Sequence, residues 1–211
     1  MLLRATGLCK RYRTLLVFDR VDLEVGRGQC LVITGANGSG KSTLLKILAG
    51  LLLPTSGQVE MEIDGRSLTA AQRRRLTGWV SPELTLYDEL SARENLSFFA
   101  RVRGVTLDVR TLDSTLSRLG LTQRADDPLS TYSSGMKQRV KYGFAIMHRP
   151  PFLFLDEPGT TMDESGARLL ADIIDEQKRH GLVVLATNDR EETAYGDRRL
   201  RLDGTGTGRP A

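Results

Sequence analysis

Residues 35–43 read Gly-Ala-Asn-Gly-Ser-Gly-Lys-Ser-Thr, and this stretch decides how the rest of the chain is interpreted. It matches the pattern GxxxxGK[ST], in which glycines let the backbone wrap closely around an anion. A helix that begins directly after the loop adds its positive end. The pattern predicts a nucleoside triphosphate site, with Lys41 on the β- and γ-phosphates and Ser42 on Mg²⁺. The residues predicted to bind the nucleotide here are Gly35, Ala36, Asn37, Gly38, Ser39, Gly40, Lys41, Ser42 and Thr43.

The segments around this loop alternate between strand and helix signals. Short apolar runs rich in β-branched or aromatic residues at 30–34, 152–155 and 182–186 predict buried strands. Apolar residues at helical spacing predict helices over 41–52 and 164–180. This alternation indicates an α/β protein with a mostly parallel sheet and flanking helices. The stretch from about 81 to 147 has helical periodicity and reads as an insertion into that sheet.

Composition places the chain among ordinary globular proteins. Its 211 residues are 40% apolar and 27% charged, which predicts one compact unit. The formal net charge of +4 is dispersed, so a solvated positive face is expected rather than a nucleic-acid site. Cys9 and Cys30 fit no zinc spacing, and their small number suggests a reducing compartment. No signal peptide or transmembrane stretch is expected, so any action at a membrane would require docking on another subunit.

Two carboxylates end the apolar run at residues 152–155. Asp156 and Glu157 follow Phe-Leu-Phe-Leu directly. An aspartate at such a strand end helps to hold Mg²⁺ in phosphoryl-transfer sites, and Glu157 is placed to orient and polarise the attacking water. By themselves, acids at a strand end often only cap a turn, but the phosphate loop favours the functional reading.

The segment Tyr-Ser-Ser-Gly-Met-Lys-Gln-Arg at 132–139 resembles the signature motif, usually LSGGQ, of the ATP-binding cassette (ABC) ATPases. Alone, it would also suit a helix N-cap. It lies 22 residues before Asp156 (134 to 156), the usual arrangement in that family. The resemblance implies that Ser134 and Gly135 contact the γ-phosphate of a nucleotide bound by a second monomer.

Further matches extend this resemblance over essentially the whole chain. Residues 158–163 read Pro-Gly-Thr-Thr-Met-Asp and resemble the family's D-loop, with Asp163 retained. Tyr12 lies where the family stacks an aromatic ring on adenine; the alternative is a strand residue that covers the core. The resemblance implies a P-loop NTPase core at 1–81 and 148–203. Its N-terminal part would be an antiparallel β region, a helical subdomain would occupy 82–147, and a flexible tail would follow at 204–211.

Two positions depart from the family pattern. The family has a glutamine after the strand that ends near residue 80, and here that place falls on Pro82 or Glu83, depending on the register. Glu83 could still reach Mg²⁺ or its water. The family also has a histidine after the last core strand, where this chain has Asn188. Asn188 can donate a hydrogen bond to the γ-phosphate but cannot carry charge. Hydrolysis is therefore expected to be slow or to depend on a partner.

The resemblance implies an ATP-hydrolysing subunit that forms a homodimer on binding Mg-ATP. It would drive an integral membrane subunit docked near residues 79–100, at the cytoplasmic face of the membrane. A short single cassette resembles the ATPase subunit of the haem exporter used in cytochrome c maturation, and other small exporter cassettes for lipids or drugs look similar. One alternative is a dimerisation module that uses ATP with little or no turnover. Another is a soluble ATPase acting on ribosomes or nucleic acid, which is disfavoured because the chain has one cassette and no charged linker.

Overall fold

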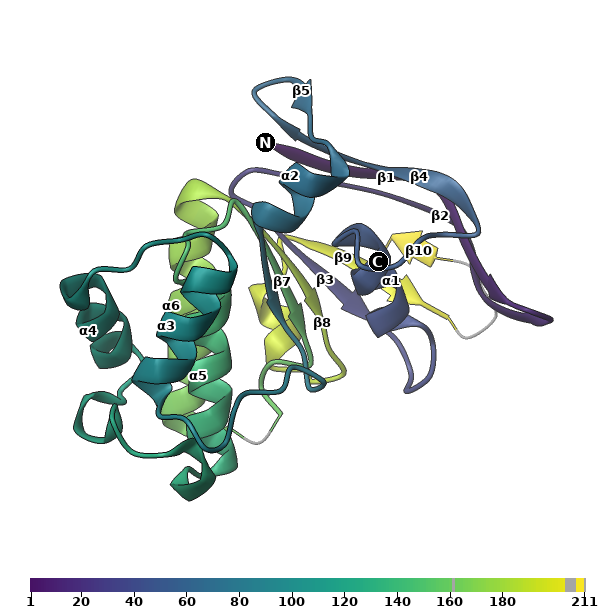
Figure 1. The fold of residues 1–211 in the computed structure, drawn as a ribbon. Helices are drawn as coiled ribbons and strands as arrows, with labels where there is room; N and C mark the ends of the chain where they lie inside the picture. The colour runs from purple at the N-terminus through teal and green to yellow at the C-terminus, as the bar shows by residue number, and fades with distance from the viewer. Residues whose placement is uncertain (161, 204–207, 211) are drawn as a thin grey trace.

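The computed structural model describes residues 1–160 and 162–203 and the backbone of residues 208–210. Two sheets and a group of helices make up the described part (Figure 1). The larger sheet has the order β10-β9-β3-β8-β7-β6, and its strands are parallel except for β10. Its strands are β3 (Cys30–Thr34), β6 (Thr77–Val80), β7 (Phe152–Asp156), β8 (Leu182–Ala186), β9 (Arg198–Leu202) and β10 (Gly208–Pro210).

Successive side chains of the central strands point to opposite faces of this sheet, and each face has its own core. On one face, Leu153 and Leu155 of β7 pack in a cluster with Val140 and Tyr142 of the helical segment. On the other face, Phe152 and Phe154 pack with residues of the N-terminal strands. All five residues of β7 and of β8 are buried, which is why these strands read as continuous apolar runs.

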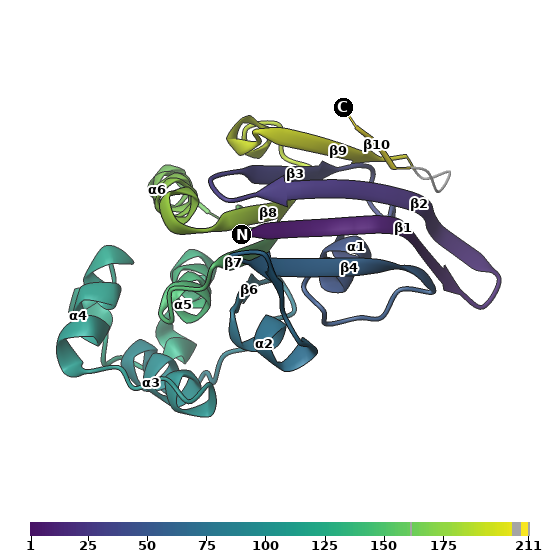
Figure 2. The same ribbon diagram turned by 90° about the horizontal axis from the view of Figure 1, so that it is seen from above.

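The smaller sheet is antiparallel and covers one face of the larger one, as the view from above shows (Figure 2). Its order is β2-β1-β4-β5, with β1 paired to both β2 and β4. Its strands are β1 (Leu2–Tyr12), β2 (Leu15–Gly26), β4 (Ser56–Ile63) and β5 (Arg66–Ser67). The expected N-terminal antiparallel region is thereby confirmed.

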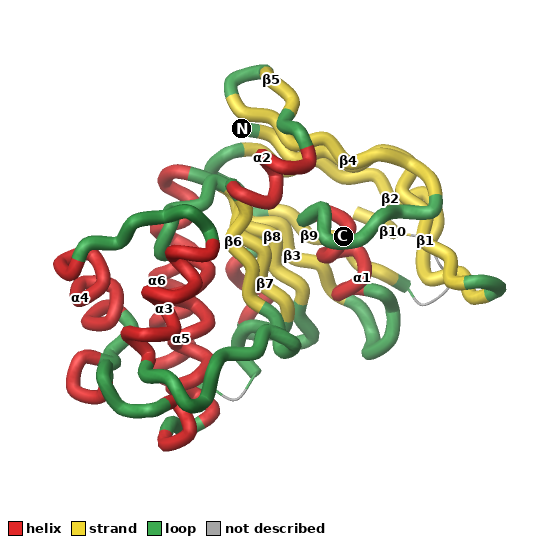
Figure 3. The backbone as a smooth tube through the Cα atoms, viewed as in Figure 1, coloured by secondary structure: helices red, strands yellow, loops and turns green. Residues whose placement is uncertain are grey.

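The helices divide between the two faces (Figure 3). They are α1 (Lys41–Leu48), α2 (Ala70–Arg75), α3 (Ala92–Val102), α4 (Val109–Arg118), α5 (Ser134–Ile146) and α6 (Glu164–His180), with short 3₁₀ turns at Thr122–Arg124, Leu129–Thr131 and Glu192–Tyr195. The apolar side of α1 packs between the two sheets, whereas α3, α4, α5 and α6 share the core of the opposite face. None of the helices in the described part of the chain has the length and apolar character that a membrane span requires.

The sequence-based element boundaries agree with the structure to within one residue except at two places. The strands at 30–34 and 182–186 and the helix at 164–180 are confirmed. Helix α1 ends at Leu48 rather than at residue 52, because Gly50 has a φ of 74° and the Leu51 N–H turns back to the Lys46 carbonyl.

The C-terminal tail is the second difference. Residues 208–210 of the expected flexible tail form β10, which pairs with the otherwise open edge of β9. The remainder of that tail, residues 204–207 and 211, lies outside the described residues. The inserted segment is helical as expected, while its boundaries as a separate subdomain, 82 and 147, remain a prediction.

Candidate nucleotide-binding site

The loop between β3 and α1 has the backbone that a phosphate cradle requires. Gly35, Gly38 and Gly40 have φ values of 151°, 79° and 98°, which L-residues with side chains rarely adopt. Space is also restricted: a Cβ on Gly35 would lie 2.4 Å from the Leu202 carbonyl oxygen, and one on Gly40 would lie 2.5 Å from a methyl group of Val17. Conformation and packing together therefore require glycine at both ends of the loop.

Lys41 opens α1 and turns its side chain back into the loop. The side chain is only 6% exposed, and its ammonium group donates to the carbonyl oxygens of Gly35 at 3.0 Å and Ala36 at 3.4 Å. The hydroxyl of Ser39 is buried in the same loop and finds no hydrogen-bond partner among the described residues. Buried polar groups are normally paired, so a donor left over at this place fits a loop built to hold an anionic group.

Ser42 and Asp156 form the centre predicted for Mg²⁺. The Ser42 hydroxyl donates to the Asp156 carboxylate at 3.0 Å, which brings the start of α1 to the carboxyl end of β7. Burial raises the pKa of Asp156, against a smaller lowering effect of the Ser42 hydrogen bond. One hydroxyl and one buried carboxylate, with nucleotide phosphates as the other ligands, suit the way Mg²⁺ is usually held. The residues present therefore fit this ion.

Glu157 adopts an unusual backbone conformation next to this centre. Its φ is 47°, the left-handed region, which costs a residue with a side chain about 1–3 kcal/mol. The Glu157 N–H donates to the Ala186 carbonyl of β8 at 2.8 Å, and this bond helps to hold the conformation. One carboxylate oxygen lies 3.6 Å from the Lys41 ammonium. The turn thus directs Glu157 toward the phosphate loop.

Asn188 and Glu83 occupy the two positions that depart from the family pattern. The side-chain amide of Asn188 donates to the side-chain oxygen of Asn37 in the phosphate loop. The Glu83 carboxylate forms an ion pair with Lys46 of α1 at 2.7 Å and is otherwise exposed. Asn188 therefore lies beside the phosphate loop, whereas Glu83 lies beside α1, where its charge acts to raise the pKa of Asp156. Which of Pro82 and Glu83 takes the place of the family's glutamine is still a prediction.

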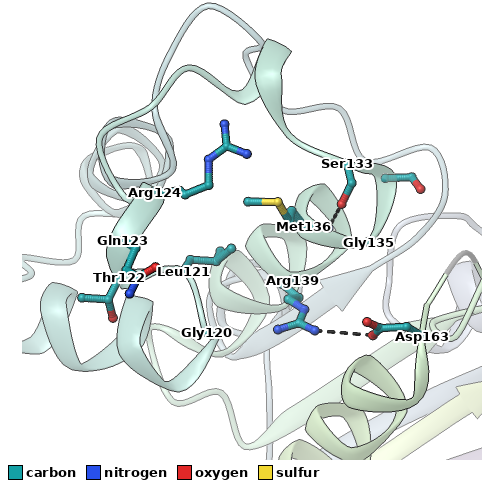
Figure 4. Close-up of a pocket in the computed structure, with 11 residues that line it drawn as sticks. Gly120, Leu121, Thr122, Gln123, Arg124, Ser133, Gly135, Met136, Arg139 and Asp163 are labelled. Carbon is teal, nitrogen blue, oxygen red and sulfur yellow. Dashed lines mark hydrogen bonds and ion pairs between the residues drawn. The ribbon is translucent and has the colours of Figure 1, made fainter.

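The N-terminus of α5 forms a second group of candidate residues, of which Ser134 also lines a groove together with Glu157. Ser133 caps this helix by accepting a hydrogen bond from the Met136 N–H at 3.2 Å, and Ser134 and Gly135 lie in its first turn. They line a hollow of about 670 Å³ together with Arg139 and with residues 120–124 (Figure 4). Sequence reasoning passed over Ser133, although the spacing of a serine three residues before the Met136 N–H is an N-cap signal.

Asp163 belongs to this second group rather than to the phosphate loop. It caps α6 by accepting from the Gly166 N–H at 2.8 Å, and its carboxylate lies 3.5 Å from the Arg139 guanidinium (Figure 4).

Tyr12, at the end of β1, is 47% exposed, with the Lys10 ammonium 4.8 Å from the ring centroid. The alternative reading of Tyr12 as a core residue is therefore wrong, and its stacking on adenine stays a prediction.

Comparison with known proteins places this arrangement in a family. A family model described as ABC transporter matches residues 18–160. The chain belongs to the ABC transporter family. The cassette is 36% identical over 205 residues to the cytochrome c biogenesis ATP-binding export protein CcmA of Pseudomonas putida (strain GB-1), covering 95% of this chain and 96% of CcmA. It is 34% identical over 189 residues to the uncharacterized ABC transporter ATP-binding protein YxlF of Bacillus subtilis (strain 168), covering 89% of this chain.

The cassette spans 62% of the length of YxlF. Among solved structures, an ATP-binding subunit of an ABC transporter superposes with a TM-score of 0.86 at 30% identity, covering 98% of this chain and 88% of that one. A bacterial ABC transporter cassette solved as a dimer superposes with a TM-score of 0.84 at 24% identity, covering 97% and 95%. The predicted α/β P-loop NTPase fold is thereby confirmed.

Proposed function

We propose that the cassette binds Mg-ATP at the loop 35–43 and hydrolyses it. The observation that carries this proposal is the convergence of Lys41 and Ser42, at the start of α1, with Asp156 and Glu157, at the end of β7, on a single place. Lys41 would move from the loop carbonyls onto the β- and γ-phosphates, and Ser42 and Asp156 would hold Mg²⁺. The ion held by these two residues would supply positive charge against the negative charge that develops during phosphoryl transfer.

Glu157 is the proposed general base. Once Lys41 binds phosphate, the Glu157 carboxylate is released from its ion pair. It can then accept a proton from the attacking water or orient that water. Asn188 would turn from Asn37 to donate a hydrogen bond to the γ-phosphate. An amide cannot take the positive charge of a histidine, so we expect slow turnover, or turnover that a partner stimulates.

The active form is proposed to be a homodimer. Lys41 and Ser134 lie on helices that pack on opposite faces of the central sheet, α1 on one and α5 on the other. Ser133, Ser134 and Gly135 would therefore meet a phosphate held by a second copy of the chain. Tyr12 would stack on the adenine, and Asp163 would lie between the copies. Two ATP molecules would then be enclosed between two identical chains.

A membrane transporter subunit is the proposed partner, docked on residues 79–100. Part of this segment lines a largely apolar groove with Lys137 and Lys141, and Tyr87 and Phe98 beside it are 47% and 41% exposed. Their rings pack edge to face at 5.3 Å between centroids. The protein would thus lie at the cytoplasmic face of a membrane, and the similarity to CcmA suggests haem export for cytochrome c biogenesis. No nucleic-acid partner is proposed.

The alternative function is an ATP-dependent dimerisation module without turnover, which Asn188 in the switch position favours. Phosphate release should be measured with the purified chain, alone and with its membrane subunit, against the Glu157→Gln variant. Release above that variant in either state supports the ATPase. Equal release in both states, together with an ATP-dependent dimer in equilibrium sedimentation, would establish the module instead. A Glu157→Gln chain that stays monomeric in saturating Mg-ATP would rule out both.

A further inference from the structure

The carbonyl of Pro158, the residue directly after Glu157, accepts two buried hydrogen bonds from α5. The Gln138 amide donates to it at 3.0 Å and the Tyr142 hydroxyl donates at 2.8 Å. Tyr142 is fully buried and Gln138 is 8% exposed. Desolvation raises the pKa of Tyr142, so its hydroxyl stays protonated and available as a donor. Two donors on one carbonyl make this an unusually well-fixed peptide group.

The two hydrogen bonds from α5 add a second attachment next to Glu157, besides its attachment to the sheet. The Glu157 N–H is fixed by the Ala186 carbonyl of β8, and the next carbonyl, that of Pro158, is fixed by α5. Between these two attachments lies the left-handed φ of 47° that directs the Glu157 carboxylate to Lys41. A strained conformation persists only where its surroundings determine it from several sides. The position of Glu157 therefore depends on where α5 lies.

The same helix carries Ser133 and Ser134 at its N-terminus, in the hollow of Figure 4. Gln138 and Tyr142 follow one and two helical turns later on α5. We propose that Gln138 and Tyr142 are positioning residues that couple the two nucleotide sites of a dimer. When the α5 N-terminus engages the nucleotide of the second copy, their bonds to Pro158 set Glu157 against the nucleotide of its own chain. This inference rests on the proposed ATP-bound dimer.

The opposite end of β7 supplies a matched control. Gln177 donates its side-chain amide to the Pro150 carbonyl at 2.8 Å and is 3% exposed. The chemistry is the same as that of Gln138 on Pro158, but the carbonyl lies before β7 rather than after it. Gln177→Leu should therefore cause a comparable loss of stability without moving Glu157.

The test compares wild type, Gln138→Leu with Tyr142→Phe, and Gln177→Leu. Amide hydrogen exchange of residues 157, 159 and 160 is measured without nucleotide, and ATP hydrolysis is measured over a range of ATP concentrations. In the double variant we expect exchange at these three residues at least tenfold faster and kcat about tenfold lower. Its Hill coefficient should fall toward one, while binding of ATP to the monomer stays within twofold. Gln177→Leu should resemble wild type in hydrogen exchange, kcat, Hill coefficient and ATP binding.

Unchanged exchange, or faster exchange with unchanged kcat and Hill coefficient, would overturn the coupling. An equal loss of kcat in Gln177→Leu would also overturn it, because general destabilisation would then explain the result. Failure of the proposed function gives a different result: the wild-type chain itself would show neither dimerisation nor turnover. A wild-type chain that dimerises without turnover would overturn a role for Gln138 and Tyr142 in setting a catalytic base.

Discussion

The Lys41 ammonium lies 3.6 Å from the Glu157 carboxylate, so the proposed phosphate-binding cation and the proposed general base face each other. The Lys41 side chain is almost fully buried at this contact, whereas that of Glu157 is 30% exposed. Each group partly neutralises the other until an anionic ligand enters the loop. The arrangement implies that binding of ATP would separate the pair and free Glu157 for its work on water.

Substitution of Lys41 and substitution of Glu157 should cause different defects. Lys41→Met should weaken ATP binding about 10- to 100-fold, because hydrogen bonds to charged groups contribute about 1.5–3 kcal/mol each. Glu157→Gln should leave ATP binding within a few-fold of wild type and lower phosphate release by at least about 100-fold. Titration with a fluorescent ATP analogue and a phosphate-release assay measure the two effects. Wild-type affinity in Lys41→Met would contradict the assignment.

Asp156 should show a conflict between stability and function. Burial raises its pKa in the folded protein, so ionisation destabilises the fold as pH rises through that pKa. At about pH 7.5 in EDTA, Asp156→Asn should therefore be more stable than wild type by about 1 kcal/mol, yet lose Mg²⁺-dependent hydrolysis. Urea unfolding measures the difference in stability between the variant and wild type.

The stability gain of Asp156→Asn should shrink as the pH falls through the raised pKa of Asp156, because the wild-type carboxyl then binds a proton. Ser42→Ala is the control, since it removes the other proposed ligand without removing the buried charge. It should lose hydrolysis without gaining stability. An Asp156→Asn chain less stable than wild type at neutral pH would be inconsistent with this account.

His148 predicts sensitivity to mild acid at the junction of α5 and β6. Burial, together with the Arg103 guanidinium 3.2 Å away, lowers the pKa of His148 to about 4. The stability that neutral His148 contributes is complete at a pH above the ordinary pKa of histidine. It is lost as the pH falls toward 4. At about pH 5 the loss should be about 2 kcal/mol, from 1.36 kcal/mol per pKa unit.

The His148 contribution can be isolated by substitution. His148→Gln can still donate to the Thr77 carbonyl, which lies 3.2 Å from His148 Nε2, but it does not titrate. Urea midpoints at about pH 7.5 and pH 5 should fall more in wild type than in this variant. Equal falls would show that His148 does not titrate in this range.

The Glu83–Lys46 ion pair predicts opposite effects on the Mg²⁺ requirement. Glu83 raises and Lys46 lowers the pKa of Asp156, so both charges act on the proposed Mg²⁺ ligand. At saturating ATP, Glu83→Ala should raise the Mg²⁺ concentration for half-maximal hydrolysis about threefold and Lys46→Ala should lower it by a similar factor, as expected for exposed charges worth about 0.2–1 kcal/mol. Shifts in the same direction would show that the pair acts only on the local structure.

The sequence predicts a part of the site well when the residues that form it are adjacent in the chain. The phosphate loop and the Asp156–Glu157 strand end were predictable, because each is a short run whose chemistry and flanking strand lie in adjacent residues. The signature segment was compatible with a helix N-cap, and the structure shows that Ser133 is the residue that caps α5. The sequence did not single out Ser133, because the capping residue depends on where the first helical turn begins, and helix boundaries are the least certain part of a sequence-based prediction.

The sequence by itself determined the alternation of strands and helices, the anion-binding loop and the carboxylates at a strand end, because local periodicity and glycine spacing encode them. Only the tertiary structure decided which of these groups meet. Strand β3 lies between β8 and β9, so Asn37 and Asn188 come together although 151 residues separate them. Likewise, two side chains of α5 converge on the carbonyl after Glu157. Strand order and helix placement arise from burying apolar surface over the whole chain, and no local pattern specifies them.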